Sequence, residues 1–225
     1  MTKSDDTGDQ AKITEKTSDA TTKLSQFVDR YVGGSLEQAF GMLEDRFRFM
    51  RWERLLRLID REREILAKRG LEAPDRSVPL SVFVPLVEAA SLEENDSMQD
   101  RWATLLANAG DSSQLIEIRR AFVSILENLT PLDAAALDCI YSYEDEFADE
   151  KLFWTKDLPE RVLIEEPTTN RFPRREVEIS LGNLARLGLL VSGMAWSSPY
   201  PYMGIYQTNL GQAFHEAISE PKEQT

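Results

Sequence analysis

The chain has few of the residues from which catalytic and metal sites are commonly built. Its 225 residues include a single cysteine, Cys139, and a single histidine, His215. One cysteine cannot form an internal disulfide, so a reducing setting is expected. One histidine excludes the H-E-x-x-H motif, paired-histidine metal sites and C2H2 zinc fingers. Neither G-x-x-x-x-G-K-[ST] nor G-x-G-x-x-G occurs, so the usual nucleotide loops are missing and we expect no cofactor.

Long hydrophobic runs are missing as well. The longest apolar stretch, residues 78–87, is interrupted by Ser81 and followed by Glu88. A membrane-spanning helix needs about 20 apolar residues, so no transmembrane segment is predicted. Residues 2–10 are all polar or glycine, which does not match a signal peptide. We therefore expect a cytoplasmic protein.

Positive charge is scarce. The chain carries 26 Lys and Arg against 39 Asp and Glu, for a formal net charge of −13. Residues 131–225 alone contain sixteen acidic and eight basic side chains. Nucleic acids and anionic membranes repel such a chain unless its basic groups are clustered. Any nucleic-acid role must therefore depend on a local cluster of arginines.

What is present is mainly helical. Residues 1–23 contain only four apolar side chains and cannot bury enough surface to offset their ordering entropy, which predicts a disordered polar tail. Between residues 24 and 130, apolar residues recur at helical spacing and predict an α-helical core. Its longest helix is predicted to begin at Ser35, a good N-cap, and to end at Arg69, before Gly70.

The stretch from Ser91 to Gly110 combines acidic residues with an Ala/Leu-rich helix. Ser91 with Glu94 and Ser97 with Asp100 match the capping box, in which side chains satisfy the free N–H groups at a helix start. This pattern predicts that a second helix begins at Ser97. A further helix is predicted over residues 114–128.

Thr130-Pro131 is the clearest boundary in the sequence. It predicts a helix that has Thr130 as N-cap, Pro131 at the first position and Asp133 at the third. For the segment 151–166, the sequence predicts neither a helix nor a strand. A helix is then predicted over 174–187, followed by two strands in LLVSG and GIYQT and by a last helix over 210–219. This is the order of a winged helix.

The sequence therefore predicts a mainly α fold, with a helical core and a C-terminal winged-helix-like α/β region over residues 131–220.

Long parts of the sequence resemble the abortive-infection alpha family of bacterial proteins. The resemblance runs through RFRFMRWERLLRLIDREREILAKRG, VPLSVFVPLVEAASLEENDSMQDRWATLLANA and FVSILENLTPLDAAALDCIY. NLARLGLL and YQTNLGQAF, near the C-terminus, also fit. The resemblance implies a cytoplasmic bacterial protein linked to phage resistance, mainly α-helical with a winged-helix-like end. It implies no known reaction and no cofactor.

Several acidic and aromatic residues are predicted to contact a partner. Helix capping does not explain Glu88 or Glu93 of the family signature. They could pair with arginines of the long helix in an internal network, which we favour, or face a partner. Exposed aromatic residues in the tip MAWSSPYPYM would suit protein contacts. The predicted partner-binding residues are Glu88, Glu93, Asp100, Trp102, Trp196 and Tyr200.

DNA binding is the first alternative function. The predicted helix 174–187 would enter a major groove, and nearby arginines could contact nucleic acid. These arginines are Arg171, Arg174, Arg175 and Arg186. Glu176 and Glu178 offset two of these charges, and the tip holds no Lys or Arg. We therefore rank protein docking first and predict a non-enzymatic protein that acts in phage defence by binding a partner protein or a second copy.

A cryptic nuclease or hydrolase is the second alternative. Asp145, Asp149 and Lys151 have a spacing that could hold Mg²⁺ beside a lysine, but a solvated acidic loop explains them more simply. Cys139 and His215 could form a nucleophile and base if the last helix packs on the first helix of the winged region. Apolar neighbours indicate instead that the cysteine is a small buried side chain.

Overall fold

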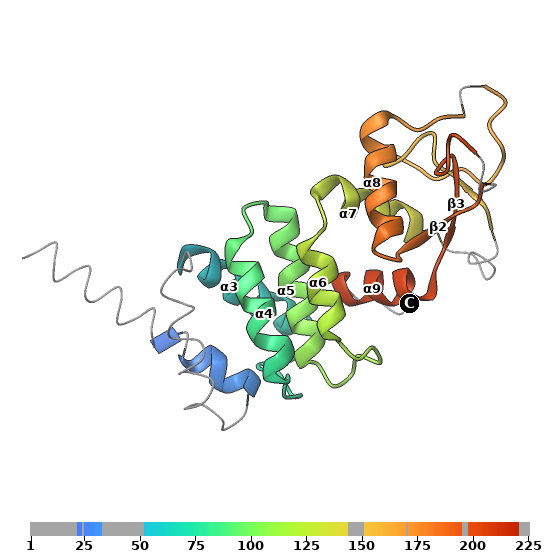
Figure 1. Ribbon diagram of the computed structural model, residues 1–225. Helices are drawn as coiled ribbons and strands as arrows, with labels where there is room; N and C mark the ends of the chain where they lie inside the picture. The colour runs from blue at the N-terminus through green and yellow to red at the C-terminus, as the bar shows by residue number, and fades with distance from the viewer. Residues whose placement is uncertain are drawn as a thin grey trace, which may run out of the picture. The chain divides into compact units, whose positions relative to one another are not determined.

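The computed structural model is mainly α-helical and ends in a small α/β region, as predicted (Figure 1). It describes residues 22–23, 25–32, 52–143, 151–169, 171–194 and 198–220. Apart from 22–23, the predicted tail lies outside the described residues, and so does the part of the predicted long helix before residue 52. Among the helices described, none has the length and apolar character needed to cross a membrane.

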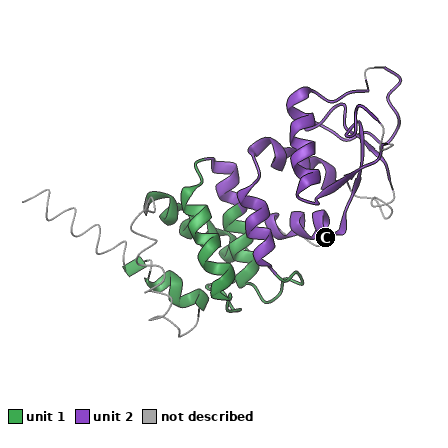
Figure 2. Cartoon of the chain, in the orientation of Figure 1, with its two compact units in different colours: residues 1–94, 102–117 green, residues 95–101, 118–225 purple. Residues whose placement is uncertain are grey.

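The chain divides into two compact units (Figure 2). Unit 1 comprises residues 1–94 and 102–117, and unit 2 comprises residues 95–101 and 118–225. The boundary falls inside helix α5 (Asp96–Gly110), whose start belongs to unit 2 and whose remainder belongs to unit 1. The predicted domain boundary after residue 130 stays a prediction.

Unit 1 is built from α3 (Trp52–Lys68), α4 (Leu80–Leu92), the later part of α5 and the helical residues 25–32. Helices α3 and α4 pack against each other through their apolar faces. The fully buried large side chains include Leu55, Leu58, Leu66, Phe83, Leu86 and Trp102. The predicted stop at Gly70 is confirmed, because its φ of 77° lies in the region that favours glycine.

The helix at 25–32 is attached to unit 1 by an aromatic cluster and a buried polar contact. The rings of Phe27, Tyr31 and Phe83 have centroids between 5.4 and 5.6 Å apart. The Tyr31 hydroxyl donates to Oε1 of the buried Glu62 at 2.7 Å. Burial raises the pKa of Glu62, and the hydrogen bond from Tyr31 opposes this rise. Tyr31 thus supplies a bond that a buried carboxylate requires.

The helix caps between α4 and α5 differ from the prediction. Helix α4 continues past Ser91, whose hydroxyl donates to the carbonyl of Glu88 at 2.7 Å. Helix α5 begins after Asn95, whose Oδ1 accepts from the backbone N–H of Met98 at 3.2 Å. The predicted capping boxes at Ser91 and Ser97 are therefore wrong, because the short link between the helices makes Asn95 the capping residue.

Helix α6 (Arg120–Glu127) is shorter than the predicted helix over 114–128. The backbone N–H of Ser113 donates to the buried Asp111 at 2.9 Å, and the side-chain amide of Gln114 donates to it at 3.0 Å. Such side-chain bonds compete with helix formation and hold this segment as a loop.

The start of α7 (Pro131–Tyr141) in unit 2 is confirmed. The Thr130 hydroxyl accepts from the backbone N–H of Asp133 at 3.2 Å, and the Asp133 carboxylate accepts from the backbone N–H of Thr130 at 2.8 Å. Pro131 occupies the first helical position, where its missing N–H leaves no bond unmade.

Helix α8 (Arg175–Arg186) packs against α7 and leads into a hairpin of β2 (Leu190–Ser192) and β3 (Gly204–Gln207). These three elements match the prediction, and Gly188 ends the helix with a φ of 77°. A further strand, β1 (Phe153–Trp154), pairs antiparallel with β3 and gives the order β1-β3-β2. Two residues are too few to show the alternation by which a strand is found in a sequence.

Helix α9 (Asn209–Ile218) also packs against α7. Thr208 caps it, because its hydroxyl accepts from the backbone N–H of Gly211 at 2.9 Å. The Tyr141 hydroxyl accepts from the backbone N–H of Thr208 at 2.9 Å and donates to the carbonyl of Leu189. Tyr141 thereby ties α7 to the start of α9 and to the chain that enters β2.

Candidate functional surface

One face of α8 points away from the core of unit 2. The buried residues of this helix are Val177, Ser180, Leu181 and Leu184. Because successive residues of a helix are about 100° apart, a second set of α8 residues lies on the side opposite the buried ones, within an arc of about 60° around the helix axis. This set, which we call the α8 stripe, consists of Arg175, Ile179, Gly182 and Arg186. Ile179 is 67% exposed and forms the apolar centre of the stripe.

A pair of exposed aromatic rings forms a second apolar feature of unit 2. The ring centroids of Phe172 and Tyr200 lie 4.4 Å apart with their planes inclined by 49°. Both side chains remain almost half exposed. Phe172 precedes α8 by three residues, so this ring pair lies near the start of that helix. Tyr200 is a predicted partner contact, whereas Trp196 lies outside the described residues.

Two of the four predicted nucleic-acid arginines are already paired with carboxylates. Arg171 lies 2.5 Å from Oε1 of Glu166, and Arg174 lies 2.8 Å from Oε1 of Glu160. All four of these side chains are exposed, so each ion pair adds little stability. Their effect is to neutralise the positive charge at the entry to α8.

The other two arginines, Arg175 and Arg186, belong to the α8 stripe. Arg186 donates to the side-chain oxygen of Asn183 at 2.7 Å, a neutral group, and no carboxylate among the described residues compensates its charge. Arg175 makes no ion pair or hydrogen bond with any other residue that the structure describes. Both guanidinium groups are therefore available to a partner.

The predicted partner residues of unit 1 and of α5 occupy different environments. Trp102 is 1% exposed and belongs to the core, where its role is packing. Glu88 and Glu93 are half-buried, and Asp100 is exposed. A partner can reach these three carboxylates, whereas Trp102 is buried.

Arg54 of α3 contacts the acidic end of α4. Its guanidinium donates to the carbonyl of Leu92 at 2.8 Å and to Oε1 of Glu94 at 2.5 Å. An arginine of the long helix therefore does bind an acid of this stretch, and that acid is Glu94. The corresponding expectation for Glu88 and Glu93 stays a prediction.

Asp138 joins three helices of unit 2. Arg101 of α5 donates to both carboxylate oxygens, at 3.0 Å for Nη1 to Oδ1, and Nε2 of His215 in α9 lies 3.3 Å from Oδ1. The His215 ring stacks on Tyr141 with centroids 5.8 Å apart. Burial raises the pKa of Asp138, but the hydrogen bonds from His215 and Arg101 outweigh it, so the pKa lies below its usual value.

Replacing Asp138 with asparagine should lower the free energy of unfolding by about 1–3 kcal/mol at neutral pH, because bonds to charged groups are lost. The pKa of Asp138 in the folded state lies below its value of about 3.9 in the unfolded state, so the ionised carboxylate stabilises the fold at pH values above about 3.9. This contribution disappears as the pH falls through the folded-state pKa. Urea unfolding at a series of pH values should show the wild type and Asp138→Asn converging in acid. A difference that stays constant across the series would contradict this role.

A model of the abortive infection alpha family matches residues 53–224, which is more than half of the chain. The chain belongs to this family. The match extends from α3 to α9, so it includes both the acidic end of α4 and the α8 stripe. No curated protein and no solved structure matches the chain.

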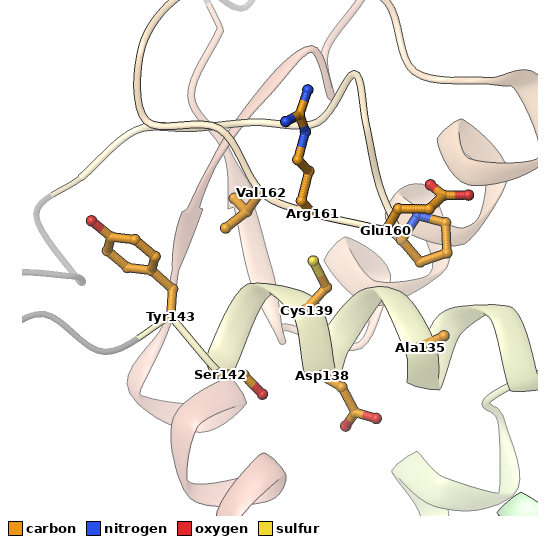
Figure 3. A pocket seen from close by; sticks show the side chains of 9 residues that line it. Ala135, Asp138, Cys139, Ser142, Tyr143, Glu160, Arg161 and Val162 are labelled. Carbon is orange, nitrogen blue, oxygen red and sulfur yellow. The ribbon is translucent and has the colours of Figure 1, made fainter.

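In this abortive infection alpha protein, α7 and the loop at 159–162 line an open hollow of about 540 Å³ (Figure 3). The Cys139 thiol points toward Val162, whereas the Asp138 carboxylate points away from Val162 (Figure 3). Burial and the carboxylates of Glu160 and Asp138 raise the pKa of the thiol, and a nucleophilic cysteine needs the opposite shift. His215, the base in the hydrolase hypothesis, contacts Asp138 and stacks on Tyr141.

The nuclease hypothesis concerns residues of which only one is described. Asp145 and Asp149 lie outside the described residues. The Nζ of Lys151 lies 5.7 Å from the ring centroid of Tyr143. Within the described ranges, no three or more His, Cys, Asp or Glu side chains form a group that could hold a metal ion.

Proposed function

We propose that this abortive infection alpha protein acts in phage defence in the bacterial cytoplasm, by binding another protein rather than by catalysing a reaction. Membership of the family supports the defence role. The order α7, β1, α8, β2, β3 supports a winged helix, in which α8 presents its outer face to a partner. The observation that carries the binding role is the exposed apolar surface of unit 2.

We assign to this surface the two exposed apolar features described above, the ring pair and Ile179 of the α8 stripe. Phe172, Tyr200 and Ile179 are 45%, 46% and 67% exposed. Aromatic side chains and arginines are enriched in protein interfaces, where a few well-packed residues supply most of the binding energy. The same side chains contribute less to unit 2 than its fully buried residues do, because nearly half or more of each remains in contact with water.

A double variant tests this proposal directly. Ile179→Ser should change the free energy of unfolding by only about 0.5 kcal/mol, since Ile179 is exposed. Tyr200→Ser should cost about 1 kcal/mol, since it also loses the contact with the Phe172 ring. If the surface holds a partner, recovery of that partner in a pull-down from infected cells should fall more than about tenfold. Plaque counts should rise to the level of cells that lack the protein.

Leu115→Ser is the matched control for this double variant. Leu115 is fully exposed and belongs to unit 1, so its replacement removes an exposed apolar side chain that is not part of the proposed binding surface. The control should retain both the partner and the protection against phage. Full protection by the Ile179 and Tyr200 variant would disprove the proposal.

DNA binding is the second candidate function, and the two uncompensated arginines of the α8 stripe favour it. The formal net charge of −13 and the carboxylates paired with Arg171 and Arg174 oppose it. Replacing Arg175 and Arg186 with alanine tests this candidate. If α8 contacts DNA, wild type should be retained on duplex DNA in a gel-shift assay and the variant should not. If the surface binds a protein, wild type itself should show no retention on duplex DNA.

A further inference from the structure

We propose that the α8 stripe selects an acidic protein segment, one that carries an aliphatic side chain between two carboxylates. This inference rests on the proposed function, because it names the chemistry of the protein that docks there.

The stripe has a positive charge at each end and an apolar centre. Arg175 and Arg186 are eleven residues apart, which corresponds to about 16 Å along a helix. Ile179 lies between them, and Gly182 follows it on the same side. Gly182 has no side chain of its own, and the Tyr202 ring lies beside it, since a Cβ at this position would stand 3.5 Å from the ring. Ile179 and the edge of the Tyr202 ring therefore form the apolar centre, against which an aliphatic group of a partner can pack.

The arginines of the stripe differ from the arginines that precede it. Arg171 and Arg174 have carboxylates of this chain as partners, at 2.5 and 2.8 Å. Among the described residues, Arg175 has no such partner, and the hydrogen bonds of Arg186 go to the neutral amide of Asn183. Carboxylates of a partner would therefore complete the two ends of the stripe. Such pairs would give specificity by excluding basic segments.

A protein segment fits this pattern better than nucleic acid does. Two uncompensated arginines allow about two phosphate contacts, and each contact adds only a small, salt-dependent affinity. Glu160 and Glu166 lie at the entry to α8 and would repel a continuous phosphate backbone. The centre of the stripe is aliphatic, and Ile179 would be left in contact with water if only phosphates were bound.

The test uses the full-length protein and three fluorescent probes. The first is a helical peptide of Glu, Leu and Ala, in which the spacing of two Glu residues about one Leu matches the stripe. The second replaces the Glu residues with Lys, and the third is duplex DNA. Anisotropy titrations at physiological salt compare wild type with Arg175→Glu/Arg186→Glu. Arg161→Glu is the control, since Arg161 is exposed but lies on the loop at 159–162.

We expect the acidic peptide to bind wild type and the Arg161 control alike, and to bind the double variant at least about tenfold more weakly. The double variant should gain affinity for the Lys peptide, because the signs of both charges are exchanged. Equal binding of the two peptides by wild type, or no binding of the acidic peptide, would overturn the inference. Tighter binding of duplex DNA would do so as well and would favour DNA as the ligand.

The failure of this inference can be told apart from failure of the proposed function. If the peptide test fails while the Ile179 and Tyr200 variant still loses phage protection, the surface binds a protein of different charge. If that variant keeps full protection, the proposed function itself is wrong.

Discussion

Gly211→Ala should lower the free energy of unfolding of unit 2 by about 3 kcal/mol or more. A Cβ at this position would lie 1.9 Å from the Tyr141 hydroxyl and 2.3 Å from the Leu189 carbonyl oxygen. Neither atom can move freely, because the Tyr141 hydroxyl donates a hydrogen bond to the Leu189 carbonyl and accepts one from the backbone N–H of Thr208. The methyl group would therefore force α9 away from α7. Urea unfolding measured by circular dichroism would give the size of the effect.

Gly182→Ala is the matched control for this change. It also adds one methyl group to a helix, but the nearest atom, in Tyr202, would be 3.5 Å away, which is an ordinary contact. Alanine is preferred to glycine inside helices, so the control should stabilise unit 2 by about 0.5–1 kcal/mol. Similar stabilities of the two variants would contradict the close packing of α9 on Tyr141.

Trp102→Ala should destabilise the protein by about 3–5 kcal/mol, the usual range for deleting a buried tryptophan. Trp102 is 1% exposed and is among the largest fully buried side chains of the protein. Its loss would leave a cavity that the surrounding side chains can fill only in part. Thermal and chemical unfolding of the purified variant would measure the cost.

This variant also decides between two roles for Trp102. If Trp102 contacts a partner, the Trp102→Ala protein should have normal stability and should lose partner binding, as expected for an exposed interface residue. If Trp102 is a core residue, the Trp102→Ala protein should be less stable, and partner binding should fall only because less protein is folded. Trp102→Phe helps to separate the two, because it refills part of the cavity and should recover part of the stability. A normally stable Trp102→Ala protein that fails to bind its partner would contradict the core position.

The α8 stripe and the Asp138 cluster have separate parts in this protein. Asp138, Arg101 and His215 hold helices of unit 2 together and are at most about a third exposed. The stripe presents Ile179, Arg175 and Arg186 to water and contributes little to the core. Variants of the cluster should therefore act through stability, whereas variants of the stripe should act through binding with the fold intact.

The sequence by itself determined the features that depend on neighbours a few residues apart. Thr130, Pro131 and Asp133 specify the start of α7, because the cap is made within one helical turn. Gly70 and Gly188 end their helices because each adopts a positive φ. The mainly α fold with a C-terminal α/β region followed from helical spacing, and the family followed from motifs along most of the chain.

Only the tertiary structure decided which residues meet across long distances in the sequence. Arg101, Asp138 and His215 lie on three helices, and no local pattern indicates that their charges pair. The spacing of Trp102 fits a helix, but its burial depends on what packs over it. The exposure of Ile179 has the same origin, because its position opposite the buried residues of α8 does not determine whether another segment covers it. Local preferences act over about one turn, whereas burial and charge pairing depend on contacts between distant segments.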